Sequence, residues 1–95
     1  IEDILYYVKS FCLELSDELK RRNVYIKTIT FKYKTNNFEN HTRSRSLNYY
    51  TNDFNTIYKV AKDIINDEKF ISPIRLIGIT VSSIKEEKIE QLKLF

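Results

Sequence analysis

The sequence predicts an α+β fold in which two helices pack on one face of an antiparallel sheet, in the order α-β-β-α-β. Two segments carry apolar residues at the three-four spacing of a helix, and three others alternate apolar with polar residues as strands do. With 95 residues the chain is long enough for one domain with a real core, and its single Gly and single Pro favour continuous regular structure.

The first segment is expected to be a helix with one buried stripe. That stripe consists of Ile4, Val8, Phe11, Cys12, Leu15 and Leu19. The helix should end near residues 21–23, because Arg21 and Arg22 suit the negative end of the helix dipole and Asn23 tolerates a left-handed turn.

Residues 24–34 and 41–50 are expected to form an antiparallel hairpin. In the first strand, the apolar face is Ile29, Phe31 and Tyr33, and the polar face is Thr28, Thr30, Lys32 and Lys34. Asn36 and Asn37 supply turn chemistry without glycine, so the chain can reverse between the two strands.

A second helix and a third strand complete the predicted fold. Asn52 or Asp53 can cap the helix, whose inner face is Phe54, Ile57, Tyr58, Ala61, Ile64 and Ile65. After Pro73, residues 74–84 form the strand, with Ile77, Ile79 and Val81 inward and Leu76, Gly78, Thr80 and Ser82 outward. The helices cover one face of the sheet, which leaves the other face open to solvent.

The open face is expected to be cationic and rich in hydroxyls. Lys32 and Lys34 project from it, and the same alternation predicts Arg43 and Arg45 beside them. Such groups bind phosphate backbones, although an ordinary solvated sheet face has the same pattern. Gly78, the only glycine, indicates close approach by another molecule, a strand bulge, or tight packing against a helix.

Other chemistry is limited by composition. His41 is the only histidine and Cys12 the only cysteine, so a metal cluster or a Cys-His nucleophile cannot be assembled from this chain. A lone cysteine favours a reducing compartment, and no apolar run is long enough to span a bilayer, so we expect a cytoplasmic protein without a membrane partner. The net charge of +3 is mild evidence for a polyanionic partner.

The end of the chain indicates a docking peptide. Residues 85–88 are all charged and are followed by the apolar ending Gln-Leu-Lys-Leu-Phe at 91–95. We expect a domain at residues 1–84 and a charged tether with a docking tail at 85–95; the alternative is a final element folded onto the core.

Three segments resemble a known family when taken in order: residues 42–47 (TRSRSL), 74–79 (IRLIGI) and 91–95 (QLKLF). Together they are similar to the little finger domain of Y-family translesion DNA polymerases, most closely the bacterial DNA polymerase IV type, with the polymerase V catalytic subunit a close variant. That family has the order β-α-β-β-α-β, so the resemblance implies that this chain lacks the first strand.

The resemblance implies a DNA-binding accessory domain of an error-prone polymerase, which grips the primer-template backbone in the major groove and is tethered to the sliding clamp. The implied DNA contacts are Thr30, Lys32, Lys34, Arg43, Ser44, Arg45, Arg75, Gly78 and Thr80. The implied clamp contacts are Gln91, Leu92, Leu94 and Phe95. It also implies that catalysis and Mg²⁺ binding belong to the parent nucleotidyltransferase. In addition, the missing strand would expose a sheet edge through which two copies of the domain can self-associate. The alternative is a protein-interaction module without a DNA role.

Overall fold

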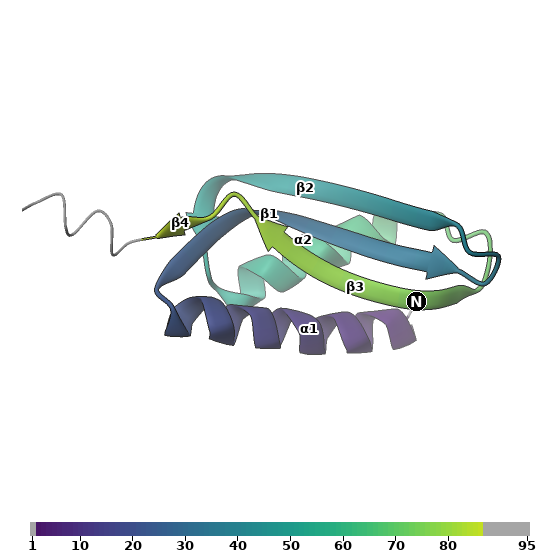
Figure 1. The fold of residues 1–95 in the computed structure, drawn as a ribbon, viewed down its shortest axis with the longest axis horizontal. Coiled ribbons are helices and arrows are strands. Elements are labelled where there is room, and N and C mark those ends of the chain that lie inside the picture. The colour runs from purple at the N-terminus through teal and green to yellow at the C-terminus, as the bar shows by residue number, and fades with distance from the viewer. Residues whose placement is uncertain (1, 87–95) are drawn as a thin grey trace, which may run out of the picture.

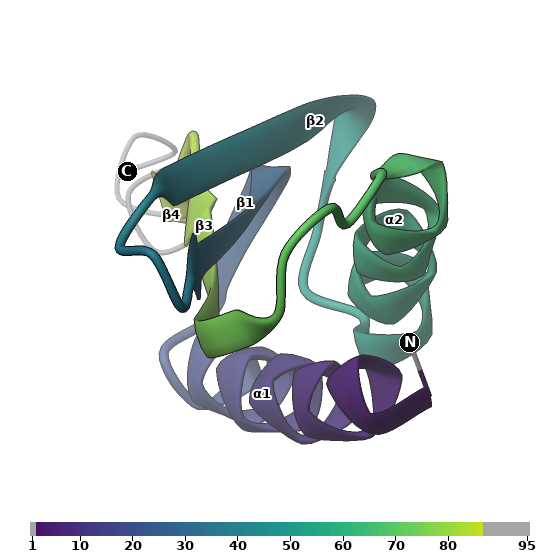
Figure 2. The same ribbon diagram turned by 90° about the vertical axis from the view of Figure 1, so that its right-hand side faces the viewer.

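A computed structural model describes residues 2–86 of the chain. Its elements are α1 (Glu2–Arg21), β1 (Val24–Thr35), β2 (Asn40–Thr51), α2 (Phe54–Asp67), β3 (Ile74–Ser82) and the short β4 (Lys85–Glu86) (Figure 1). The predicted class and the order α-β-β-α-β are confirmed. Both helices lie on one side of the sheet, which is clearest in the end-on view (Figure 2).

The sheet is antiparallel with the strand order β2-β1-β3, so the longest strands flank each other and β3 lies at an edge. β4 pairs with Val24 and Tyr25, at the beginning of β1. Ser83, between β3 and β4, has a left-handed backbone with φ of 61°. The strand pairing therefore extends to residue 86, two residues beyond the predicted domain boundary.

The helix ends follow the local signals in the sequence. α1 stops where Asn23 adopts φ of 54° and its N–H donates to the carbonyl of Lys20. α2 begins at the cap Asp53, whose carboxylate accepts hydrogen bonds from the backbone N–H and the hydroxyl of Thr56. These bonds hold the pKa of Asp53 below its ordinary value.

The core lies between the helices and the inner face of the sheet. Its buried apolar side chains are Val8, Cys12, Leu19, Ile26, Ile29, Phe31, Tyr33, Ile57, Ala61, Ile64, Ile65 and Ile79. Cys12 is completely buried, as the sequence predicted, and burial raises the pKa of its thiol to about 11. It therefore acts as a small core residue rather than as a reactive thiol.

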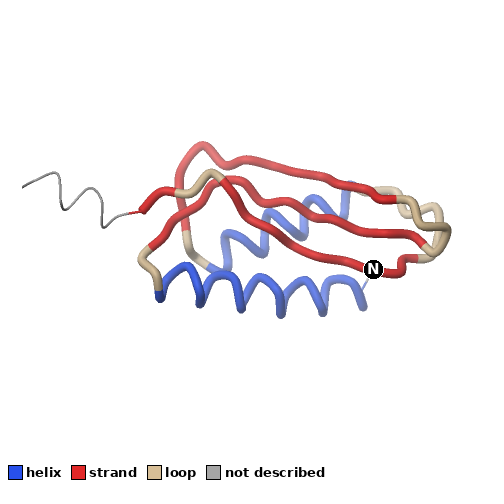
Figure 3. Tube along the Cα trace, in the orientation of Figure 1, coloured by secondary structure: helices blue, strands red, loops and turns tan. Residues whose placement is uncertain are grey.

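The turn between β1 and β2 forms at the predicted residues. Asn36 and Asn37 lie in it, but the residue with the left-handed backbone is Phe38, with φ of 66°. The turn is closed by the N–H of Thr35, which donates to the carbonyl of Glu39. Figure 3 shows that this loop lies beside the loop before β3 at one end of the molecule, where the N–H of Asn36 donates to the carbonyl of Pro73.

Candidate nucleic-acid interface

The face of the sheet opposite the helices is mostly polar on β1, β2 and β3, with Leu76 as an exposed apolar residue. Side chains alternate between the two faces along a strand, so the register places every second residue of each strand on this open face. From β1, β2 and β3 in turn, the open face carries Thr28, Thr30, Lys32, Lys34; Asn40, Thr42, Ser44, Ser46; and Leu76, Gly78, Thr80, Ser82. Six predicted DNA contacts therefore lie together: Thr30, Lys32, Lys34, Ser44, Gly78 and Thr80.

Hydroxyl groups pair across the strands of the open face. The hydroxyls of Thr30 and Ser44 are 2.7 Å apart, and those of Thr28 and Ser46 are 2.8 Å apart. Thr28 also contacts the hydroxyl of Ser83 at 3.0 Å. These bonds fix the side-chain rotamers, and each hydroxyl can both donate and accept, so the row retains hydrogen-bonding capacity toward solvent.

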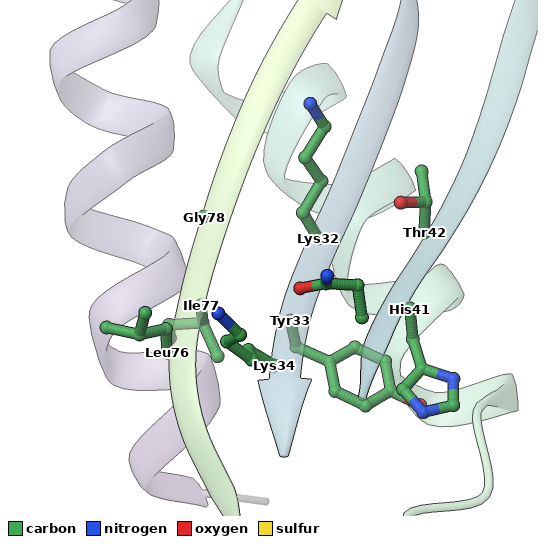
Figure 4. A pocket seen from close by; sticks show the side chains of 9 residues that line it. Lys32, Tyr33, Lys34, His41, Thr42, Leu76, Ile77 and Gly78 are labelled. Atoms are coloured by element: carbon green, nitrogen blue, oxygen red, sulfur yellow. The ribbon is translucent and has the colours of Figure 1, made fainter. Parts of the chain in front are cut away.

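Gly78 lies opposite Lys32 on the open face, next to a shallow hollow of about 470 Å³ (Figure 4). A methyl group added at Gly78 would meet nothing within 4 Å. Tight packing against a helix, one of the explanations that the sequence left open, is therefore wrong. A bulge is wrong as well, because the register shift of β3 lies at the beginning of the strand, at Arg75, rather than at Gly78. The side of Gly78 that would carry a Cβ atom therefore faces open space.

Arg43 and Arg45 are not on the open face, contrary to the prediction from alternation. They pair with Phe31 and Ile29, whose side chains point to the helices, so both arginines share the helix side of the sheet. The prediction failed because it set the register of β2 one residue out, and a shift by one residue moves every side chain to the other face.

Both arginines are held by carboxylates at the end of α2. Arg43 Nε lies 2.9 Å from Glu68 Oε1, and Arg45 forms an ion pair with Asp67. Glu68 also accepts a hydrogen bond from the hydroxyl of Tyr33. Burial, together with this hydrogen bond and the negative charge of Glu68, raises the pKa of Tyr33 to about 12.

Arg75 lies at a bulge, where β3 has one residue more than β1 between the pairs Lys34–Leu76 and Thr35–Ile74. Its guanidinium carbon is 4.6 Å from the centre of the Phe38 ring, and Lys34 Nζ is 5.6 Å from the same ring. The predicted contact Arg75 is therefore part of a cation-π cluster at the hairpin end of the open face.

A second cation-π cluster, which the sequence analysis missed, occupies the opposite end. Ile26 and Thr51 are paired and buried, so their neighbours Lys27 and Tyr50 turn to the open side. Lys27 Nζ lies 5.2 Å and Lys85 Nζ 5.5 Å from the centre of the Tyr50 ring. Lys85 belongs to a run of charged residues, and the register near Lys27 is irregular. Neither residue therefore lies in a periodic pattern from which its position could have been predicted.

The charges of the domain are sorted between its two sides. The cations on the open side are Lys27, Lys32, Lys34, Arg75 and Lys85. Within residues 3–85, the carboxylates lie instead on α1, at α2 and its two flanks, and in the hairpin turn. Among residues 3–85, cations thus outnumber carboxylates on the open side, which favours a positive potential there.

The remaining predicted sites fall outside this face. Gln91, Leu92, Leu94 and Phe95 lie outside the described residues. Between residues 2 and 86, no group of three His, Cys, Asp or Glu side chains could hold a metal ion. In the same range, neither helix has the length and apolar character needed to cross a membrane.

Comparison with known protein families shows which family the chain belongs to. Residues 1–94 match the model of the impB/mucB/samB family C-terminal domain. The chain belongs to this family. The resemblance to the C-terminal domain of Y-family polymerases, inferred from three short motifs, is thereby confirmed for nearly the whole chain.

Members of the impB/mucB/samB family with similar sequences include proteins named DNA polymerase IV. The chain is 33% identical over 92 residues to that of Clostridium perfringens strain 13, covering 96% of this chain and 26% of that protein. It is 34% identical over 85 residues to that of Listeria monocytogenes serotype 4a, covering 88% and 24%. For Staphylococcus haemolyticus the identity is 32% over 95 residues, covering 99% and 26%. The chain thus spans about a quarter of the length of these relatives.

Proposed function

We propose that this chain is the DNA-binding accessory domain of an error-prone translesion DNA polymerase, and that its open face grips the primer-template backbone in the major groove. The observation that carries the proposal is the sheet face with five cations and paired hydroxyls, from which the carboxylates of residues 3–85 are absent. Family membership supports it, because relatives that are about a third identical are DNA polymerases.

The chemistry of the face favours phosphates over base edges. Lys32 and Lys34 supply charge, while the hydroxyls of Thr30, Ser44 and Thr80 supply directed hydrogen bonds. Gly78 allows the backbone of a duplex to approach β3 closely, since no side chain stands there. Binding through such contacts carries no sequence preference and falls steeply with salt.

Arg43 and Arg45 have a different role in this proposal. Their side chains are 50% and 45% exposed respectively, and each is paired to a carboxylate at the end of α2. Either could reach a phosphate only along the outer edge of β2, and it would first have to give up its ion pair. We therefore assign them mainly to joining β2 to α2.

Two matched double variants test this assignment. Lys32→Gln with Lys34→Gln removes two charges from the open face, and Arg43→Gln with Arg45→Gln removes two from the helix side. Each lost phosphate contact should weaken duplex binding about eightfold at ~0.1 M salt, so the lysine pair should weaken it by roughly 60-fold. The arginine pair should have little effect in fluorescence anisotropy. Equal losses in both variants would contradict the assignment.

The tail is proposed to bind the sliding clamp through Gln91, Leu92, Leu94 and Phe95. Apolar anchors of this size supply about 1.5 to 3 kcal/mol each, and ordering the peptide offsets part of this, so a dissociation constant on the order of micromolar is expected. Deleting Leu94 and Phe95 should remove clamp binding in calorimetry and leave DNA binding unchanged. Undiminished clamp binding after the deletion would refute the role of the tail.

Three further proposals concern the parent protein. Nucleotidyl transfer and its Mg²⁺ site would lie in the three quarters of such a polymerase that this chain does not cover. Its place of action would be the cytoplasm, where DNA repair and replication occur in bacteria. The outer edge of β3 is unpaired in the described sheet and offers backbone groups for self-association, which sedimentation at several concentrations would detect as a rising mass.

A further inference from the structure

The hairpin turn contains an aromatic residue that neither the core nor the turn requires. Phe38 is 61% exposed, so its ring is not there to be buried. It also adopts φ of 66°, in the left-handed region where a bulky side chain is rare. The loop of residues 36–38 is a three-residue hairpin connection, whose last position normally carries glycine or asparagine. A residue that is unfavourable for the turn and exposed to solvent indicates a function of the ring itself.

The surroundings of the ring are cationic. Lys34 Nζ and the guanidinium carbon of Arg75 lie 5.6 Å and 4.6 Å from its centre. Arg75 reaches the ring because it is the extra residue of the β3 bulge, a device that re-aims side chains. Next to the cluster lies the hollow of the open face, whose lining includes Lys32, Lys34, Leu76 and Gly78 (Figure 4).

An exposed ring beside two cations matches the chemistry of an unpaired nucleotide. Proteins that bind single strands stack bases on aromatic rings and bind the adjoining phosphates with Lys and Arg. A base within a duplex has no free face, so the ring can stack only where the strand is unpaired. We propose that Phe38 stacks on an unpaired base next to the duplex, with Lys34 and Arg75 on the adjacent phosphates at the end of the duplex. This inference rests on the proposed function, and it adds a preference for a junction between double- and single-stranded DNA.

The experiment compares the affinity of the protein for three DNA probes, so that the effect of the bases can be separated from that of the phosphate charge. The probes are a short blunt duplex, the same duplex with a single-stranded thymine extension, and the same duplex with an abasic extension of equal length. The abasic strand carries the same phosphates without bases. Wild-type protein should bind the thymine extension about tenfold more tightly than the abasic one, within the range of stacking one base on an aromatic ring.

The variant Phe38→Gly should abolish that difference and leave blunt-duplex affinity unchanged. Because glycine suits the left-handed position, its Tm should be at least as high as that of the wild type. The control Tyr49→Ala removes another exposed ring, 52% exposed on β2, and should keep the difference.

Equal affinity of the wild type for the thymine and abasic extensions would overturn the inference. The exposed ring of Phe38 would then be assigned to contact with a protein partner. A large loss of Tm in Phe38→Gly would also overturn the inference, because it would make the ring a structural element. Absence of binding even to the blunt duplex would instead overturn the proposed function, and this inference with it.

Discussion

Glu68 is the residue whose removal should most affect the joint between the sheet and α2. Its side chain is only 10% exposed, accepts a hydrogen bond from the hydroxyl of Tyr33, and pairs with Arg43 at 2.9 Å. Glu68→Ala leaves the hydroxyl of the buried residue Tyr33 without this partner and Arg43 without a carboxylate. The neighbouring variant Asp67→Ala is a matched control, because Asp67 also pairs with an arginine of β2 but is 67% exposed.

The size of the effect follows from the burial of each pair. A hydrogen bond to a charged group contributes about 1.5 to 3 kcal/mol, and the half-exposed ion pair with Arg43 adds about 0 to 1 kcal/mol. Unfolding entropy of roughly 2.1 cal/mol/K per residue gives about 200 cal/mol/K for 95 residues, so each kcal/mol lowers Tm by about 5 °C. Glu68→Ala should therefore lower Tm by roughly 8 to 20 °C, and Asp67→Ala by less than about 5 °C.

Thermal unfolding followed by circular dichroism measures both shifts. A double-mutant cycle of Glu68→Ala with Tyr33→Phe should give a coupling energy of at least about 1 kcal/mol, because the two side chains share one hydrogen bond. Equal small shifts for Glu68→Ala and Asp67→Ala, or additive effects in the cycle, would refute the assignment of Glu68 as a buried anchor.

Three other predictions concern single positions. Asp53 caps α2 with a lowered pKa, so its charge stabilises the fold above the unfolded value near 3.8, and this contribution is lost as pH falls through the folded pKa. The difference in Tm between wild type and Asp53→Ala should therefore be present at pH ~7 and shrink as the pH falls below 3.8. Unchanged behaviour across this pH range would contradict the cap. Gly78→Ala should stabilise the domain by about 0.5 to 1 kcal/mol, since the added methyl meets nothing, and should weaken DNA binding; tighter binding would contradict the close approach of DNA to β3. Cys12 should react with a thiol reagent only on unfolding, which a rapid reaction in the native protein would disprove.

The fold was largely predictable because its signals are local. The spacing of Val8, Cys12 and Leu19 marks the buried stripe of α1, and Asn23 and Asp53 mark helix ends through their own backbone and side-chain chemistry. The order of elements follows directly from such signals, as does the inward face of β3.

The site was only partly predictable, because faces depend on register. Residues 40–51 contain few apolar side chains, so nothing in β2 itself indicates which parity faces the helices, and Arg43 and Arg45 were placed on the wrong side. β1 had a clear apolar face, and Lys32 and Lys34 were placed correctly. The clusters around Phe38 and Tyr50 depend on bulges and on contacts between distant segments, which the alternation of residues along one strand does not encode.

The salt dependence of duplex binding tests the central claim most directly. If the five cations Lys27, Lys32, Lys34, Arg75 and Lys85 each neutralise one phosphate, the slope of log affinity against log salt should be about −4.5, a loss of roughly 500-fold between about 50 and 200 mM salt. Replacing Lys32 and Lys34 by Gln should bring the slope to about −2.7, and replacing Arg43 and Arg45 by Gln should leave it unchanged. A slope near zero in the wild type, or the larger change in the arginine variant, would contradict the account.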